Sequence, residues 1–254
     1  MKNKLKNNKN KKVGKLNFEF LLRNVICNLV IAIIVFSIFW AGISSNFDSG
    51  AVEVSNSEYN GTIYAGDKMT NKLSLMINVY WGNEFLVQML DTLKKYDIKT
   101  TFFVGGSWAE NNEDLLKKIY EDGHEVASHG YSHKEHGKLD YYNNLEEMKR
   151  CHKVIKQILS IDMTLFAPPG GSYNSSTIKA SEEMGYKTIM WTRDTIDWRD
   201  KNEQLIFSRA TSNMSGGDLI LMHPTSSTAA VLEKIILYAR DNDLKITKVS
   251  DVIS

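Results

Sequence analysis

Residues 123–133 read GHEVASHGYSH, and the rest of the chain can be understood as a scaffold around them. Within this stretch, Glu125–Ser128 follows a glycine turn and predicts the end of a short buried strand. His129 and His133 come next, at a spacing that places both rings on one side of a helical turn. Imidazole is the commonest protein ligand for transition metals, so the stretch favours a metal site at the end of a strand. Two surface histidines without a metal fit the same spacing.

Apolar segments of two kinds alternate beyond residue 72. Some are short and continuous, as in buried strands, and others carry apolar residues three and four positions apart, as in amphipathic helices. We expect strands at 73–80, 99–104, 125–128, 163–167, 187–191, 218–222 and 244–252, and helices at 85–96, 113–121, 143–158, 175–184, 203–213 and 229–240. This alternation predicts a parallel sheet covered by helices. With about seven strand–helix repeats, we expect an α/β fold that closes into a distorted (β/α) barrel.

The amino-terminal end differs from the rest in charge and hydropathy. Residues 1–23 carry seven lysines and one arginine against one glutamate, whereas residues 24–46 carry no charged residue. An apolar run of about 20 residues can span a bilayer, and positive charges before it hold the amino terminus in the cytoplasm. We therefore expect a basic cytoplasmic tail (1–23), a transmembrane helix (24–46), a stalk or linker (47–71) and an outer domain (72–254).

A cleaved signal peptide is the alternative, with Ala41–Ser44 as a weak cleavage site. Retention of the span predicts a single-pass protein of the cell membrane whose carboxyl-terminal domain is extracellular. The net charge of the whole chain is +1, so the part that follows the lysine-rich tail is acidic overall. Lysines next to an apolar span are explained by topology and by attraction to anionic lipid, which argues against nucleic acid as a partner.

Polar residues gather in the loops that follow the expected strands. The chain contains only three prolines, and all of them, Pro168, Pro169 and Pro224, fall in these loops. Because proline fixes the backbone, rigid turns are placed at one end of the barrel. The clusters are residues 78–84, His129 with His133, residues 167–171, residues 194–198, and His223 with Pro224. Together they favour a functional site at the carboxyl ends of the strands.

Three of these segments, GHEVASHGYSH (123–133), DTIDW (194–198) and LILMH (219–223), resemble the polysaccharide deacetylases with a NodB-type domain, carbohydrate esterase family 4. The resemblance runs from about Leu73 to Val252, and the loop at residues 80–84 is similar to that of the sporulation-type branch. It implies hydrolysis of N-acetyl groups on a cell-wall or related polysaccharide. The implied partner is peptidoglycan or another N-acetylated glycan, and the implied cofactor is a divalent metal ion, zinc in the first place.

The resemblance also implies catalytic roles for individual residues. His129 and His133 would hold the metal, which acts as a Lewis acid on the acetyl carbonyl and lowers the pKa of its bound water. His223 would be the general acid that protonates the leaving amine. Asp194 would pair with His223, keeping its ring charged and oriented.

Substrate contacts follow from the same resemblance. One wall of the groove would be shaped by Pro168, Pro169 and Tyr173. The acetyl pocket would be lined by Trp198 and Leu221. An aromatic residue of the core is an equally good interpretation of Trp198.

Three positions depart from the family pattern. Its first motif reads Thr-Phe-Asp-Asp-Gly, with a general base and then a metal ligand, whereas Asn78 and Val79 stand at these two positions. A neutral amide cannot accept the proton of a metal-bound water, and a catalytic zinc ordinarily has three protein ligands. Ala167 replaces an arginine that contacts the catalytic aspartate. A buried arginine without its carboxylate would cost several kcal/mol of stability. Loss of the arginine together with the aspartate is therefore less costly than loss of the aspartate alone.

Other groups could replace the missing carboxylates. Glu84 is the first candidate, because its loop leaves the first strand, although it also suits the first turn of the following helix. Asp197 and His136 are further candidates, whereas His124 precedes its strand and is expected to be structural. Two functions remain open: a metal-dependent deacetylase with a remodelled base, and a catalytically inactive glycan-binding pseudoenzyme of the same fold.

Overall fold

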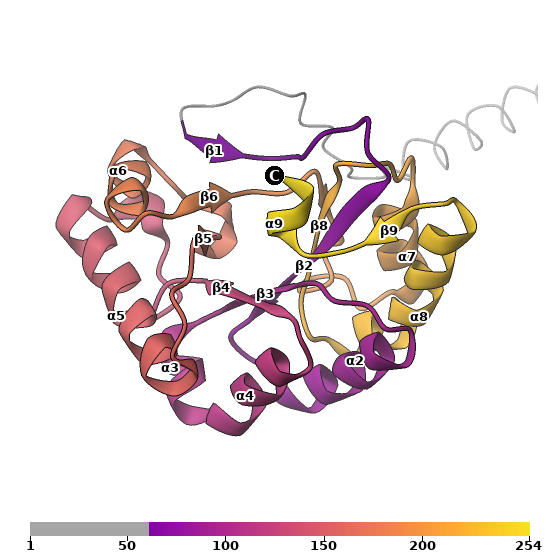
Figure 1. Ribbon diagram of the computed structural model, residues 1–254, viewed down its shortest axis with the longest axis horizontal. Helices are drawn as coiled ribbons and strands as arrows, with labels where there is room; N and C mark the ends of the chain where they lie inside the picture. Colours follow the sequence, from indigo (N-terminus) through magenta and orange to yellow (C-terminus); the bar gives the residue numbers. More distant parts are fainter. Residues whose placement is uncertain (1–60) are drawn as a thin grey trace, which may run out of the picture. The chain divides into compact units, whose positions relative to one another are not determined.

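The computed structural model describes residues 61–254, and this part of the chain is built around one parallel sheet (Figure 1). The strands are β1 (Thr62–Ile63), β2 (Lys72–Val79), β3 (Thr101–Val104), β4 (Glu125–Ser128), β5 (Leu165–Phe166), β6 (Lys187–Ile189), β7 (Arg193–Asp194), β8 (Leu219–Met222) and β9 (Lys245–Ile246). They are ordered β1-β6-β5-β4-β3-β2-β8-β7, and β9 pairs with the beginning of β2. The central strand β2 is buried along almost its whole length, as is usual for a parallel strand covered on both faces.

Closure of the barrel was expected and is wrong. The two edge strands β1 and β7 do not pair with each other among residues 61–254, so the sheet is an incomplete, curled barrel. Each edge strand is two residues long, which leaves few backbone groups with which to complete the ring. The expected count of about seven strands missed β1 and β7, which are too short to show a periodic pattern.

The helices are α2 (Asn83–Lys95), α3 (Gly106–Asn111), α4 (Glu113–Glu121), α5 (Tyr141–Leu159), α6 (Ser175–Glu183), α7 (Glu203–Thr211), α8 (Ser226–Asp241) and α9 (Val249–Val252), with short 3-10 turns at His136–Lys138 and Pro169–Gly171. In Figure 1 all of them except α9 follow the outer side of the strands. The last helix, α9, lies inside the curve. Val249 and Val252 pack there against Met76 of β2 and Phe103 of β3, which fills the inner face.

The alternation of side chains along β2 sets up the functional end of the sheet. Ile77 and Val79 belong to the large apolar core between the sheet and the outer helices, whereas Met76 belongs to the inner cluster. Successive side chains of a strand point to opposite faces. Asn78 therefore faces inward at the carboxyl end of β2, and Val79 faces the helices.

Two predicted boundaries were wrong. The expected strand at 244–252 is a strand only at Lys245–Ile246, and the chain then turns into α9. The expected linker at 47–71 contains β1, which pairs with β6, so the sheet begins ten residues earlier than predicted. Gly66 fixes this segment against the domain, because its backbone N–H donates to the Gly217 carbonyl at 2.8 Å.

Within the described part of the chain, no helix has the length and hydropathy needed to cross a membrane. The predicted basic tail, the transmembrane helix and most of the linker lie in residues 1–60, outside the described residues.

Candidate functional site

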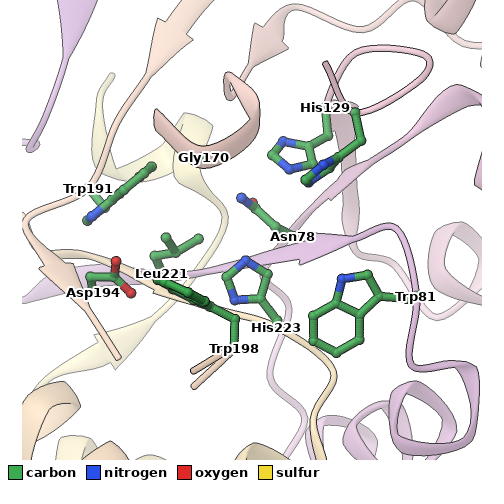
Figure 2. A pocket seen from close by; sticks show the side chains of 10 residues that line it. Asn78, Trp81, His129, Gly170, Trp191, Asp194, Trp198, Leu221 and His223 are labelled. Carbon is green, nitrogen blue, oxygen red and sulfur yellow. The ribbon is translucent and has the colours of Figure 1, made fainter. Parts of the chain in front are cut away.

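A cavity of about 450 Å³ opens at the carboxyl ends of the strands (Figure 2). It is lined by Asn78, Trp81, His129, His133, Gly170, Trp191, Asp194, Trp198, Leu221 and His223. These residues come from the ends of β2, β4, β5, β6, β7 and β8 and from the loops after them. The sheet therefore brings together most of the residues that the sequence singled out.

The two histidines that follow β4 lie side by side, with ring centroids 5.1 Å apart. His129 is buried, and its Nδ1 donates to the Ala167 carbonyl at 2.7 Å, which leaves Nε2 as the atom with a free lone pair. Burial lowers the pKa of His129 well below its ordinary value, and the neighbouring His133 adds to this effect. Desolvation, followed by the effect of His223, also lowers the pKa of His133. Both rings are therefore neutral near pH 7, the form that ligates metals.

A third strong ligand for a metal is missing beside these histidines. Asn78 points into the cavity between His129 and His223 (Figure 2), and its buried Oδ1 has no hydrogen-bond partner among the described residues. Val79 is fully buried in the outer core. No group of three histidine, cysteine, aspartate or glutamate side chains that could hold a metal occurs in residues 61–254. The site thus falls one charged ligand short of the usual set for a catalytic zinc, and we assign no hydrolytic step through a metal.

His223 is held by Asp197, and the predicted pairing with Asp194 was wrong. Asp197 Oδ1 accepts from His223 Nδ1 at 2.8 Å, and Asp197 Oδ2 accepts from the His223 backbone N–H at 2.7 Å and from Thr228 Oγ1 at 2.5 Å. The chain reaches this position through a tight turn in which Ile196 has a φ of 52°. That turn carries Asp197 beneath His223, whereas Asp194 stays at the end of β7.

Asp194 has a different place, in the wall of the cavity. Its Oδ1 accepts from the backbone N–H of Ile196 at 2.8 Å. Figure 2 shows its carboxylate on the same side of the cavity as Trp191 and Leu221, across from His129. Burial raises the pKa of Asp194. It is the only carboxylate among the residues that line this cavity.

Three indole rings give the cavity its aromatic character. Trp198 is 56% exposed, so its interpretation as a core residue was wrong. Trp81 stacks on the His223 ring with a centroid distance of 6.0 Å and an angle of 7° between the planes. Trp81 and Gly170 lie in the loop clusters that the sequence singled out, at 78–84 and 167–171, but no role of their own was predicted for them. The contribution of Trp191 was missed, because residue 191 was expected to end a strand, whereas β6 ends at Ile189.

Other predicted residues lie beside the cavity and do not line it. Glu84 is exposed in the first turn of α2, the position of the alternative helix-terminus role, and it does not line the cavity, so its replacement of the base stays a prediction without support from this geometry. Pro168 and Pro169 are buried behind Gly170, which supplies the lining surface of that loop. Tyr173 shares a 2.7 Å hydrogen bond between its hydroxyl and that of Tyr64.

The remaining two histidine candidates are structural. His136 is fully buried, with Nδ1 against Asn144 Oδ1 at 2.6 Å. His124 precedes β4 and accepts from the Thr100 backbone N–H at 3.2 Å, as the prediction of a structural role for it requires. Neither residue is part of the cavity lining.

Comparison with known proteins agrees with this geometry. The model of the polysaccharide deacetylase family matches residues 65–189. The uncharacterized protein YlxY of Bacillus subtilis is 38% identical over 191 residues, which are 75% of this chain and 60% of that protein. A peptidoglycan-N-acetylglucosamine deacetylase of Bacillus cereus is 30% identical over 177 residues, 65% of this chain and 80% of the enzyme.

Solved structures include a CE4 family pseudoenzyme from Bacillus anthracis, with a TM-score of 0.74 and 33% identity over 76% of this chain and 69% of that chain. A mutant CE4 family pseudoenzyme with restored enzymatic activity also has a TM-score of 0.74, at 31% identity over 76% of this chain and 71% of that chain. The fold, the matched family model and these relatives lead to one conclusion. The chain belongs to the polysaccharide deacetylase family.

Proposed function

We propose that this protein binds glycans built from amino sugars in its groove and does not hydrolyse them. One observation carries the proposal: the side chain that faces the cavity at the end of β2, where the resemblance to the family implies a general base, is the amide of Asn78, and its buried oxygen has no partner among the described residues. An amide has no basic lone pair that could accept a proton from water at neutral pH.

No neighbouring carboxylate lies where it could act as the general base. Asp197 is fully committed, because three donors contact its two oxygens. Asp194 lies across the groove from His129 (Figure 2). A general base must lie within hydrogen-bond reach of the water that it activates, and neither aspartate meets that condition beside the histidine pair.

The groove still presents the aromatic side chains that a glycan-binding site requires. Trp81 and Trp198 are both partly exposed at the groove, and Trp191 lines its wall. Concave sites lined by aromatic rings with a few polar groups are typical of small-molecule and sugar recognition. The Bacillus cereus relative is a peptidoglycan-N-acetylglucosamine deacetylase, which supports an amino-sugar glycan as the ligand class.

Metal-dependent deacetylation is the second candidate function. The observation in its favour is the intact pair of His223 and Asp197, which a general acid requires, together with the neutral ligand atoms of His129 and His133. A membrane-anchored protein with its domain outside the cell remains a prediction from residues 1–46.

Two measurements on the full chain separate these functions: binding of an N-acetylglucosamine hexamer, and release of acetate from that hexamer and from peptidoglycan. We expect binding without acetate, with zinc, cobalt or nickel added as well as without. The double variant His129→Ala/His133→Ala serves as the control for any metal-dependent signal. Acetate release that this variant loses would overturn the proposal in favour of the deacetylase.

A further inference from the structure

We propose that the groove prefers amino sugars whose amine is free, and that Asp194 is the residue that selects them. This inference rests on the proposed glycan-binding function and adds the chemical form of the ligand. The charge and surroundings of Asp194 support it.

Only one of the two Asp194 carboxylate oxygens accepts a hydrogen bond from the described part of the chain. Its Oδ1 accepts one hydrogen bond from the Ile196 backbone, and among the described residues Oδ2 has neither a hydrogen-bond partner nor an ion pair. Asp197, three residues later, accepts three hydrogen bonds and is closed off from the groove. A carboxylate that faces a groove with an open oxygen is available to a ligand that donates.

The arginine side chains near Asp194 form their ion pairs with other carboxylates. Arg199 and Arg209 both pair with Asp200, at 2.9 and 2.7 Å. Arg193 precedes Asp194 directly, but its side chain pairs with Asp218 at 2.8 Å. Asp194 is therefore an anion without a partner of its own in the described part of the chain. Burial raises the pKa of Asp194, although the Ile196 backbone N–H and the more distant charges of His223 and Arg209 act in the opposite direction.

Two indole rings line the same cavity as this unpaired charge. Trp191 and Trp198 are drawn on the Asp194 side of the cavity in Figure 2. The face of an indole attracts cations, and the attraction is larger when the cation is desolvated. An ammonium group beside Asp194 would gain the ion pair and the aromatic contact together. A neutral acetamido group can donate one hydrogen bond from its N–H, but it brings no positive charge, so the charge of the carboxylate would stay uncompensated in a partly desolvated site.

The inference places this protein after a deacetylation step. A free amine on such a glycan arises when water cleaves the carbon–nitrogen bond of an acetamido group, which yields the amine and acetate. That reaction must be supplied by a separate, active amidohydrolase. The present chain would then recognise the product that such an enzyme leaves behind.

The test uses two probes of equal length, a hexamer of glucosamine and a hexamer of N-acetylglucosamine, titrated calorimetrically into the full chain in mildly acidic buffer. We expect the glucosamine hexamer to bind about tenfold more tightly, a difference of about 1.4 kcal/mol. In Asp194→Asn the ratio of the two affinities should fall to near one. The matched control is Asp241→Asn, which removes the same charge from an exposed side chain at the end of α8 and should leave the ratio unchanged.

Salt gives a second measurement that does not depend on the folding of any variant. An ion pair is screened as ionic strength rises, so the preference for the glucosamine hexamer should shrink in high salt. Equal affinities, or a preference for the acetylated hexamer, would overturn the inference and leave glycan binding without hydrolysis standing. Failure of both hexamers to bind would overturn both proposals. A preference that survives in Asp194→Asn would show that Asp194 does not select the amine.

Discussion

Asp197 holds His223 at two points, with Oδ1 at 2.8 Å from the ring Nδ1 and Oδ2 at 2.7 Å from the backbone N–H. The same carboxylate also accepts from Thr228, which lies in the first turn of α8. These bonds tie the loop after β7 to the loop after β8. His223 is therefore kept in place by buried hydrogen bonds, although the cavity offers the neutral amide of Asn78, and no carboxylate, at the end of β2.

Removal of the Asp197 carboxylate should destabilise the domain. Asp197→Ala leaves three buried donors without an acceptor, and we expect the free energy of unfolding to fall by about 3 kcal/mol. Thr228→Val removes one of the three hydrogen bonds and should cost about 1 kcal/mol. Denaturant unfolding of both variants measures these changes. Equal losses in the two variants would contradict the central role of the carboxylate.

Restoring a carboxylate at position 78 should create a metal site. Asn78→Asp would place an anionic oxygen beside the imidazoles of His129 and His133, which completes a set of three protein ligands. We expect the metal-free variant to melt at a lower temperature than the parent, because a buried carboxylate is then unpaired. Added zinc should reverse that loss, since a ligand that binds only the folded state stabilises it.

Asn78→Ser is the control for this change, because it alters the same side chain without supplying a charge. It should show no recovery with zinc. Placing Asn78→Asp in a His129→Ala background should abolish the recovery. Persistent stabilisation by zinc in that background would mean that the metal binds elsewhere on the chain.

His124 should make the domain sensitive to acid. Burial lowers the pKa of His124 from its ordinary value of 6.5 to about 4, so as pH falls the unfolded chain takes up this proton before the folded protein does. The stability contributed by the neutral ring is fully present above pH 6.5 and is lost as pH falls through this window toward pH 4. The loss is at most about 3 kcal/mol.

The variant His124→Asn isolates this effect. Its side-chain oxygen can still accept from the Thr100 backbone N–H, but the amide does not titrate. Unfolding free energies of parent and variant should converge as pH is lowered from neutrality toward pH 4, because only the parent loses this contribution. A difference that stays constant across these pH values would show that His124 is not the sensitive group.

The long elements and most of the groove could be predicted because their signals are local. The apolar strand at residues 73–80, the helix at 143–158 and the polar residues after each strand all follow from periodicity and composition. The sequence is enough to list the loop residues that face the same cavity from different strands. It is not enough to predict which of these residues contact each other, because the contacts depend on where each loop turns.

Asp194 and Asp197 illustrate that limit. Both are aspartates of one short segment, and either could have paired with His223. The choice is made by the left-handed turn at Ile196, where a β-branched residue adopts a positive φ that tertiary contacts impose. Glu84 illustrates the same point: it follows β2 closely, but α2 begins at Asn83 and directs its side chain to solvent. The pairing of β1 with β6 also spans most of the domain and leaves no local signal.

Whether residues 61–71 belong to the folded domain can be tested at Gly66. A Cβ at this position would lie 2.0 Å from the Val252 carbonyl oxygen, so the segment that follows β1 passes directly against the last residue of α9. We expect Gly66→Ala to lower the free energy of unfolding by about 1–3 kcal/mol, because backbone atoms must shift to admit the methyl group. Met69→Ala is the control in the same segment, since its side chain is 93% exposed and should be replaceable at no cost. If Gly66→Ala unfolded like the parent chain, residues 61–71 would behave as the linker that the sequence predicts. A loss confined to Gly66→Ala would instead establish that the domain needs this segment, and that expression of the domain from residue 72 onward would remove part of its sheet.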